Sequence, residues 1–397
     1  MRTDVAIVGA GPAGAWAAYT LARRGARVTI FDPSHPREKP CGGGVTGRAL
    51  ALVADAIGRT QCPQRVIRSA RFIDANGGDA RIDLEFDRVG ADLRVRPDSP
   101  TNHASLIVAS RAVFDAALLD AARGAGASVS GSRVTNVTVD ADGARIDTAG
   151  GTHRAGVVIG ADGANSLVRR KIVQPFPRRL LSIATGFFAH GVTSDEVVIE
   201  LVADPAGYLW SFPRPDHLAI GVCTQADAGI APAALREQAR EWTGRMHLAE
   251  DARLEPYSWP IPSLDARAFD TLALASDRWA LAGDAAGLVD PITREGIYFA
   301  LLSGQWAAEA VADGRFPRDY TARVRDEIAP ELACAARFKA GFFRPAFMRL
   351  LVHALQRSAT VREILVDLVA GRQSYLSLKW RLLKTLEIGL AWKMARG

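Results

Sequence analysis

A glycine-rich turn near the N-terminus restricts the folds that this chain can adopt. The turn lies between a short apolar run and a stretch with the residue pattern of a helix. Residues 5–8 are a short apolar run of the kind found in buried parallel strands. Gly9, Gly11 and Gly14 follow with G-x-G-x-x-G spacing, and residues 15–24 then show the apolar spacing of a helix. A strand, a turn of this kind and a helix in this order predict a dinucleotide-binding βαβ unit.

Each residue type in this stretch has a physical role in binding a dinucleotide. Gly9 permits the tight turn, Gly11 lets the backbone approach a pyrophosphate, and Gly14 lets helix and strand pack closely. The helix N-terminus adds N–H groups and the positive end of the helix dipole. The second strand, residues 27–31, ends at Asp32, whose carboxylate can accept hydrogen bonds from a ribose.

The composition is that of an ordinary folded protein with more than one core. A chain of 397 residues, of which 48% are hydrophobic and 23% charged, favours two closely joined domains and argues against disorder. The net charge of +6 would suit nucleic acid, anionic lipid or a phosphorylated substrate, but charge alone favours a generally basic surface. The sequence contains no nucleic-acid-binding motif, so we expect that the protein does not bind nucleic acid.

The cysteine spacing and the hydropathy of the sequence indicate the cellular compartment of the protein. The cysteines Cys41, Cys62, Cys223 and Cys334 are far apart and form no C-x-x-C pair, which indicates reduced thiols rather than disulfides or a metal site. The first expected strand begins at residue 4, which leaves no room for a signal peptide, and no stretch of about 18 uncharged apolar residues is present. We therefore expect a cytoplasmic protein without a transmembrane helix.

Beyond the first unit, strand-like and helix-like stretches follow one another without an internal repeat. Residues 65–98 alternate in the manner of strands around an Asn76-Gly77 turn. The other expected strands lie at 134–139, 144–148, 155–159, 180–189, 197–202, 208–212, 218–224 and 279–282. The expected helices lie at 48–57, 111–124, 232–246, 296–313 and, with breaks at Pro345 and Gly371, across 316–397.

Two later turns resemble those of a flavin-binding family. Strands 155–159 and 279–282 run into Gly160-Ala161-Asp162-Gly163 and Gly283-Asp284. Together with the glycine turn, these segments resemble the FAD-dependent family that includes para-hydroxybenzoate hydroxylase. The resemblance implies that Asp284 bonds the ribityl chain of FAD and that Arg111 lies against the flavin or the pyrophosphate. It also implies that Gly296 and Ile297 offer backbone N–H groups to the pyrimidine edge, where reduced flavin carries negative charge.

Two further segments resemble the geranylgeranyl reductases of that superfamily. Residues 207–213 read Gly-Tyr-Leu-Trp-Ser-Phe-Pro and are followed by Gly221, which gives the pattern YxWxFPxxxxxxxG. The segment Lys-Pro-Cys-Gly-Gly-Gly at 39–44 stands where this superfamily's loop passes the flavin ring. The resemblance covers most of the chain, though it is thin across 62–100 and after residue 320, and it implies an enzyme that saturates prenyl double bonds.

Together with these patterns, the resemblance predicts an α/β fold in which a Rossmann-type FAD-binding domain is interleaved with a mostly antiparallel β-sheet substrate domain and followed by a C-terminal helical segment. The expected FAD-binding domain comprises 1–60, 101–175 and 270–315, the substrate domain 61–100 and 176–269, and the helical region 316–397. The residues expected to bind FAD are Gly9, Gly11, Pro12, Ala13, Gly14, Asp32, Pro33, Cys41, Gly42, Gly43, Arg111, Asp162, Gly283, Asp284, Gly296 and Ile297.

Prenyl reduction would depend on three candidate catalytic residues, Cys41, Tyr208 and Trp210. An isolated alkene is a poor hydride acceptor, so the site must hold the double bond against reduced flavin, exclude water and protonate the other carbon. Cys41 is the one thiol of its loop and therefore a candidate proton donor or flavin gate, with a structural thiol as the alternative. Tyr208 and Trp210 lie two apart on a strand and share a face, either as a tunnel wall or as core.

The C-terminal segment 375–397 bears on how a lipid substrate would arrive. Leucines recur every four residues from Leu378 to Leu390, and basic residues outnumber the single acid, Glu387. A basic amphipathic helix of this kind can rest on an anionic membrane as a peripheral contact, or pack its leucines onto the protein.

Two other classes of function remain open from the sequence. A flavin-dependent monooxygenase or halogenase acting on an aromatic substrate would share the fold, although halogenases of this superfamily carry a W-x-W-x-I-P-like motif where residues 208–213 read Tyr-Leu-Trp-Ser-Phe-Pro. A non-catalytic lipid carrier would have little reason to keep intact flavin segments. No second G-x-G-x-x-G turn stands between a strand and a helix, so the electron donor, NADPH or a ferredoxin, would have no dedicated domain.

Overall fold

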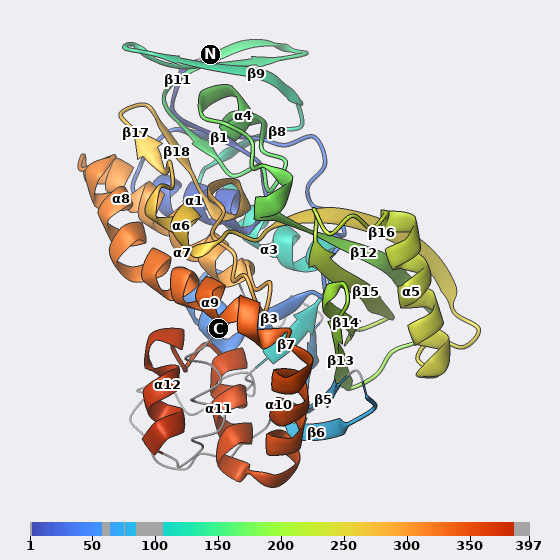
Figure 1. The fold of residues 1–397 in the computed structure, drawn as a ribbon. Coiled ribbons are helices and arrows are strands. Elements are labelled where there is room, and N and C mark those ends of the chain that lie inside the picture. The colour runs from blue at the N-terminus through green and yellow to red at the C-terminus, as the bar shows by residue number, and fades with distance from the viewer. Residues whose placement is uncertain (1, 58–63, 75, 85–105, 385–397) are drawn as a thin grey trace.

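The computed structural model describes residues 2–57, 64–74, 76–84 and 106–384 (Figure 1). These residues form a mainly parallel sheet with helices around it, a mostly antiparallel sheet, a small connecting sheet and a layer of C-terminal helices. This arrangement confirms the predicted fold class, whereas the proposed division into domains stays a prediction.

The first sheet is built around the N-terminal strand. Its strands are β1 (Arg2–Val8), β2 (Val28–Phe31), β8 (Ser128–Ser130), β9 (Val134–Asp140), β10 (Gly143–Thr148), β11 (Gly151–Gly160), β17 (Ala275–Ser276) and β18 (Trp279–Leu281). The order is β17-β18-β11-β1-β2-β8, and β10 pairs with both β11 and β9. β1 runs parallel to β11 and β2, and Val5, Ala6 and Ile7 are almost fully buried, as expected for an apolar run without alternation.

The helices of this part of the chain lie against the first sheet and against one another. They are α1 (Pro12–Ala22), α3 (Arg111–Gly124), α4 (Leu167–Ile172), α6 (Ala266–Asp270), the short 3₁₀ turn η2 (Gly283–Ala286) and α7 (Ile297–Ala312). α1 packs between α3 and α7. Gly304 of α7 makes this packing possible, because a Cβ there would lie only 2.3 Å from the carbonyl oxygen of Ala13.

The second sheet has seven strands and one parallel pair. Its strands are β5 (Ser69–Ile73), β6 (Asp79–Asp83), β12 (Leu181–His190), β13 (Glu196–Ala203), β14 (Ala206–Pro213), β15 (His217–Gln225) and β16 (Arg253–Pro262). The order is β16-β12-β15-β14-β13-β5-β6, in which only β13 and β5 run parallel. Helix α5 (Pro232–Arg245) packs Leu235, Ala239 and Trp242 onto one face, and the short turn η1 (Arg178–Leu180) precedes β12.

The third sheet joins the loop after β2 to the start of α3. It consists of β3 (Gly44–Thr46), β4 (Gln64–Val66) and β7 (Leu106–Ala109) in the order β3-β7-β4. β3 continues into α2 (Gly47–Val53), and β7 continues into α3. The N–H of Ala109 donates to the carbonyl of Gly43 at 3.0 Å, so the glycine-rich loop lies beside the N-terminus of α3.

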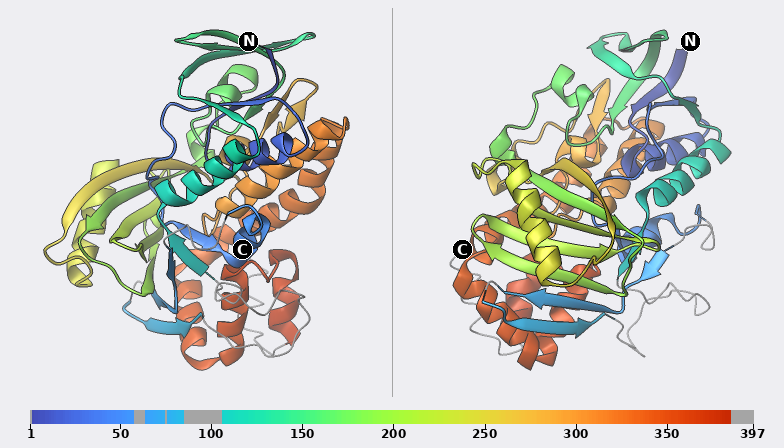
Figure 2. Two further views of the ribbon diagram at one scale, coloured as in Figure 1. Left: turned by 180° about the vertical axis from the view of Figure 1, so that it is seen from behind. Right: turned by 90° about the vertical axis from the view of Figure 1, so that its right-hand side faces the viewer.

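The C-terminal helices begin against α7, and the last three of them form a layer beside β5 and β6 (Figure 2). They are α8 (Arg318–Arg323), a π-helical turn (Val324–Ile328), α9 (Ala329–Phe342), α10 (Pro345–Arg357), α11 (Ala359–Val369) and α12 (Tyr375–Lys384). Both predicted breaks occur: Pro345 takes the first position of α10, and Gly371 has a φ of +76° between α11 and α12. Residues 385–397, expected to be helical, lie outside the described part, within which no helix is long and apolar enough to span a membrane.

β16 is the principal strand that the sequence pattern did not locate. It contains Pro256, Pro260 and Pro262, which lack an N–H donor and obscure the usual strand signal. The structure places β16 at the edge of the second sheet, paired only with β12, where such residues are tolerated.

The contact between α1 and α7 gives a stability prediction. We expect Gly304→Ala to lower the free energy of unfolding by about 1–3 kcal/mol, because the added methyl group would push against the backbone of α1. Gly124→Ala, also in a helix but with open space at its Cβ, should be neutral or stabilising by up to about 1 kcal/mol. Chemical denaturation of both variants provides the measurement, and an equal effect of the two would contradict the packing argument.

Candidate active site

Most residues expected to bind FAD line one cavity of about 670 Å³. The cavity lies between the turns that follow the first sheet, the open face of the second sheet and the C-terminal helices. Of the expected cofactor residues, those that line it are Gly9, Gly11, Pro12, Ala13, Asp32, Pro33, Cys41, Gly42, Gly43, Arg111, Asp162, Asp284, Gly296 and Ile297. Gly14 and Gly283 are not in its wall. Gly14 packs on the turn behind it, and Gly283, with φ of +58°, lies against Ala13 and Ala300.

The glycine turn after β1 brings separate chain segments into backbone contact. Gly9 has a φ of +102°, and a Cβ there would lie 2.4 Å from the carbonyl oxygen of Ala161. A Cβ on Gly14 would lie 1.9 Å from the carbonyl oxygen of Gly9. Gly11 begins α1 without a side-chain cap, so the first N–H groups of the helix are placed to receive an anion such as a pyrophosphate.

Asp32 is tied into the turn by several hydrogen bonds. Its carboxylate accepts from the N–H groups of Ala10, Ser34 and His35, at 2.9, 2.7 and 3.0 Å. Its Oδ2 also lies 2.8 Å from Nδ1 of His35. Burial alone would raise the pKa of Asp32, but His35 and the backbone donors outweigh burial and lower it. Asp32 therefore holds the loop after β2 in place, and its bond to a ribose stays a prediction.

Arg111 begins α3 and is almost fully buried. Its guanidinium makes a paired hydrogen bond with Asp115, at 2.9 and 2.8 Å, and its Nη1 lies 3.6 Å from Sγ of Cys41. Burial alone would raise the pKa of Asp115, but Arg111 and then His35 hold it below its ordinary value. The sequence placed Arg111 against the flavin or pyrophosphate. The structure adds that it links the core of α3 to the Cys41 thiol.

An ion pair that the sequence did not reveal holds the loop carrying Cys41. Arg214, fully buried just after β14, pairs with Glu38 and donates from Nη2 to the carbonyl of Cys41 at 2.6 Å. Glu38 also accepts from Oγ of Ser110 at 2.7 Å and from N–H of Arg111 at 2.9 Å. Burial lowers the pKa of Arg214 to about 10, so the guanidinium stays charged at neutral pH. The second sheet, the loop and α3 thus meet at Glu38.

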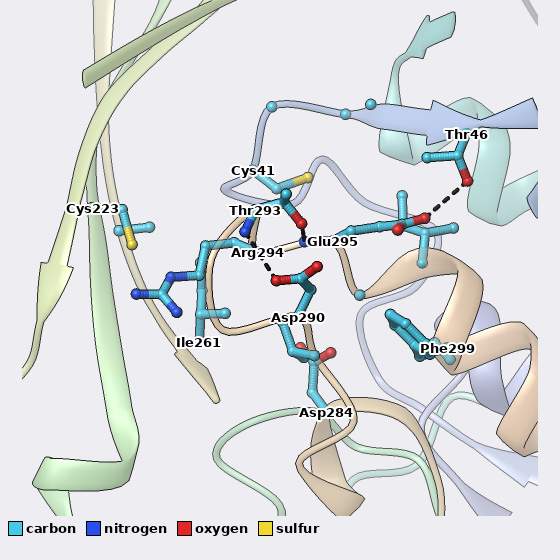
Figure 3. A pocket seen from close by; sticks show the side chains of 18 of the residues that line it. Cys41, Thr46, Cys223, Ile261, Asp284, Asp290, Thr293, Arg294, Glu295 and Phe299 are labelled. Carbon is cyan, nitrogen blue, oxygen red and sulfur yellow. Dashed lines mark hydrogen bonds between the residues drawn. The ribbon is translucent and has the colours of Figure 1, made fainter. Parts of the chain in front are cut away.

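The other two predicted turns hold their aspartates differently. Asp162 accepts from the N–H groups of Leu167 and Val168, at 2.6 and 3.2 Å, and so caps the start of α4. Burial raises its pKa despite these bonds. Asp284 accepts from Nζ of Lys39 at 3.1 Å and projects into the cavity (Figure 3). Asp284 is therefore open to a ligand on one side, whereas Asp162 is hydrogen-bonded to the start of α4, the helix that follows it.

The loop between η2 and α7 supplies further polar groups that the sequence analysis missed (Figure 3). Oδ1 of Asp290 accepts from the N–H groups of Ile292 and Thr293, at 2.7 and 3.1 Å, which closes the loop on itself. Glu295 pairs with Arg48 and accepts from Oγ1 of Thr46 at 2.8 Å. Burial raises the pKa of Glu295, which Arg48 only partly offsets. The loop ends at Gly296, which begins α7 without a side-chain cap and leaves its first N–H groups facing the cavity.

The aromatic motif forms one wall of the cavity. Tyr208, Trp210 and Phe212 alternate along β14, so their rings share one face, and all line the cavity. Trp210 pairs with Gly221 across the sheet, where a Cβ would lie 2.6 Å from its ring. Phe212 lies over Gly42, where a Cβ would lie 2.8 Å from its ring. Gly42 and Gly221 thus leave room for the rings of Phe212 and Trp210, which explains why a glycine stands at position 221 of the motif.

Tyr208 and Trp210 combine the two roles weighed from the sequence. Trp210 is 4% exposed and packs with Ala184, Phe188 and Cys223, yet it also lines the cavity. The hydroxyl of Tyr208 donates to the carbonyl of Thr293 at 3.1 Å, which ties β14 to the loop before α7. Both residues therefore belong to the cavity wall, Trp210 through its packing and Tyr208 through its hydrogen bond to the loop before α7. Cys223 and Cys334 are free thiols, as is Cys41, and Cys62 lies outside the described residues.

Beyond the aromatic wall, most of the side chains that line the cavity are apolar, although Glu331, Gln373 and Tyr375 of the C-terminal helical region line it as well. It passes between the second sheet and the C-terminal helices. The apolar side chains lining this part are Ala70, Phe72, Leu84, Leu106, Val197, Ile199, Leu201, Phe338, Phe342, Phe347, Leu351, Val361, Ile364, Leu365, Leu368, Val369, Leu378 and Leu382. Polar groups are thus concentrated at the turns of the first sheet, and hydrocarbon lines the opposite part.

Comparison with known proteins agrees with this geometry. A family model described as an FAD binding domain matches residues 2–301. The chain belongs to this family. It is 28% identical to the menaquinone reductase of Mycolicibacterium smegmatis, over 93% of this chain and 92% of that protein. It is 29% identical to the geranylgeranyl diphosphate reductase of Rhodobacter capsulatus, over 78% of this chain and 75% of that one.

A solved structure shows the same fold. The geranylgeranyl bacteriochlorophyll reductase-like protein of Thermoplasma acidophilum superposes with a TM-score of 0.76 and 20% identity, over 96% of this chain and 99% of that one. The predicted resemblance to the geranylgeranyl reductases is confirmed, and the protein is an FAD-dependent oxidoreductase of the geranylgeranyl reductase type. The uncapped starts of α1 and α7, facing the same cavity, fit an anionic dinucleotide.

His35 gives a prediction about pH. Burial alone would lower the pKa of His35, but Asp115 and Asp32 outweigh burial and raise it. Because the pKa of His35 is higher in the folded state than in the unfolded state, protonation of His35 stabilises the fold. This stabilisation is fully present below pH 6.5, the ordinary pKa of histidine, and it is lost as the pH rises through the folded-state pKa. We expect His35→Asn to lower the melting temperature more at about pH 6 than at about pH 9. His353→Asn, an exposed control on α10, should change it little at either pH, and equal losses for His35→Asn at both would contradict this account.

Proposed function

We propose that this enzyme saturates C=C double bonds of a prenyl, geranylgeranyl-type chain, with hydride from reduced FAD and a proton from the protein. The observation that supports the proposal is the continuity of one cavity from the FAD-binding turns, past Tyr208 and Trp210, into an apolar space under the C-terminal helices. A long isoprenoid chain matches such a space in chemistry and shape. The names of the related menaquinone and geranylgeranyl diphosphate reductases point to the same class of substrate.

The residues around Cys41 suit proton delivery. The Sγ atom lies 3.6 Å from Nη1 of Arg111 and 3.9 Å from Nη2 of Arg214. When the thiol gives its proton to the alkene carbon, the negative charge left on sulfur faces these two guanidinium groups. FAD, when bound, would supply the hydride for the other carbon. Tyr208 and Trp210 would hold the chain in position and keep water from the reacting carbons.

The electron donor is a separate part of the proposal. We propose NADPH or a ferredoxin as the reductant of the flavin, reaching it transiently rather than through a domain of its own. Anaerobic mixing of the yellow protein with each donor, followed by the loss of flavin absorbance, identifies which of them reduces it.

The reaction is tested with reduced enzyme under anaerobic conditions. On addition of geranylgeranyl diphosphate or a prenylquinone, we expect flavin reoxidation together with a product that has gained one pair of hydrogens for each double bond. A protein that saturates none of these chains, but consumes oxygen and NADPH in the presence of an aromatic compound, would instead be a monooxygenase or halogenase.

Substitution of Cys41 tests its role as proton donor. We expect Cys41→Ala to slow saturation by about 100-fold or more while leaving the flavin spectrum intact. The matched control is Cys334→Ala, whose thiol lies on α9 and does not line the cavity. An unchanged rate in Cys41→Ala would assign the proton to water or another group and leave Cys41 a structural role.

We further propose that α12 makes a peripheral contact with an anionic membrane. Leu378 and Leu382 face inward and line the cavity, whereas Leu376 and Trp380 are 56% and 65% exposed. Lys379 and Lys384, also exposed, border these two apolar side chains. One face of the helix therefore lines the cavity, and the other combines apolar and basic groups as interfacial helices do.

Vesicle binding tests this contact. The protein should sediment with vesicles that contain phosphatidylglycerol and much less with pure phosphatidylcholine. Leu376→Ser combined with Trp380→Ser should weaken binding by about 10-fold or more, because both side chains are exposed and free to enter the lipid. Equal sedimentation of the wild type and the double variant would exclude α12 as the membrane contact.

A further inference from the structure

Two basic side chains converge where β15 and β16 end: Arg294 lines the cavity, and Lys339 meets Arg294 at Ser263 without being among the lining residues. Nζ of Lys339, on α9, donates to Oε1 of Gln225 at 2.6 Å and to Oγ of Ser263 at 2.7 Å. Nη1 of Arg294 donates to the same Ser263 oxygen at 2.7 Å. Two cations therefore share one neutral acceptor, an arrangement in which their charges repel.

Within the part of the chain that the structure describes, neither side chain forms an ion pair, and the nearby carboxylates of Asp227 and Asp265 only partly oppose the lowering of the Lys339 pKa. The hydrogen bonds of both side chains go to amide, hydroxyl and carbonyl oxygens, and no carboxylate there forms an ion pair with Arg294 or Lys339. Burial and then the charge of Arg294 lower the pKa of Lys339 to about 7. Nε of Arg294 is buried without a hydrogen-bond partner. An anion at this point would offset the repulsion and accept the remaining N–H groups.

The backbone holds Arg294 in an unusual conformation. Arg294 has a φ of +62°, a region that residues other than glycine seldom adopt. From this position its side chain extends across the cavity toward β15 and β16, where Cys223 and Ile261 lie (Figure 3). Residues held in such conformations cluster at active sites and ligand-binding sites.

The pair lies at a boundary between polar and apolar surroundings. Apolar and aromatic side chains line the cavity next to the pair: Phe338 precedes Lys339 on α9, Tyr208 bonds the residue before Arg294, and Ile261 lies near the end of β16. From there the cavity continues into the apolar space between the second sheet and α10–α12. A molecule with an anionic head and a hydrocarbon tail would match this order of surfaces.

We propose that Arg294 and Lys339 bind the phosphate or diphosphate group of a prenylated substrate whose chain occupies the apolar part of the cavity. This inference rests on the proposed prenyl reduction and narrows its substrate to phosphorylated prenyl compounds. A free prenyl diphosphate and a prenylated phospholipid share this chemistry. In both, the head would be fixed at the pair and the chain would extend past Tyr208.

Direct binding tests the site without turnover. We expect inorganic diphosphate to bind the oxidised holoprotein in calorimetric titration, and Lys339→Met to weaken this binding by about 10- to 100-fold. Lys339→Arg should retain most of it. Lys171→Met, which removes an exposed lysine of α4 that does not line the cavity, is the matched control and should bind as the wild type does. Absent binding, or equal binding by Lys339→Met and wild type, would overturn the site.

Turnover then identifies the source of the phosphate. Lys339→Met should lower kcat/KM for geranylgeranyl diphosphate or a geranylgeranylated phospholipid by about 10- to 100-fold, and leave it within about 2-fold for neutral geranylgeraniol. Whichever phosphorylated compound shows the loss is the class that uses the site. Equal loss for the neutral alcohol would overturn the proposal. If no prenyl compound is saturated but diphosphate binding still depends on Lys339, the reductase proposal fails and the anion site stands.

Discussion

The ion pair between Glu38 and the buried Arg214 connects the parts of the candidate active site. Arg214 comes from the second sheet, Glu38 from the loop after β2, and Glu38 also accepts from the first residues of α3. Arg214 is fully buried, so loss of Glu38 would leave its charge unpaired in a buried environment, which is costly. The position of the Cys41 loop relative to the aromatic wall therefore depends on this pair, because Arg214 also bonds the Cys41 carbonyl.

The sequence predicted those parts of the site whose residues act locally. The glycine spacing after the first strand, the turns at Asp162 and Asp284, and the aromatic motif each leave a pattern within a few residues. The structure explains two of these glycines sterically, since Gly14 packs on Gly9 and Gly221 lies under Trp210. The fold class followed from these local patterns, from strand and helix periodicity, and from the resemblance to a flavin-binding family that the motifs carry.

The parts that escaped prediction depend on partners distant in the chain. Glu38 and Arg214 are separated by 176 residues, and Arg48 and Glu295 by 247, so neither pair has a signature within one sequence. Similarly, the four-residue leucine spacing predicted an amphipathic helix, but it did not show that the inward leucines of α12 would line the cavity. Pairing across the fold arises only when the sheets and the helical layer come together.

The turn between α11 and α12 has a mechanical consequence. Gly371 offers no side chain, so the stem of Arg48 lies directly against it, and a Cβ there would lie 2.2 Å from Cδ of Arg48. The guanidinium of the same residue lies 4.0 Å from the ring of Tyr298 and pairs with Glu295 beside the start of α7. The Arg48 side chain thus contacts both the turn between α11 and α12 and the loop before α7, so that neither can shift far without displacing the other.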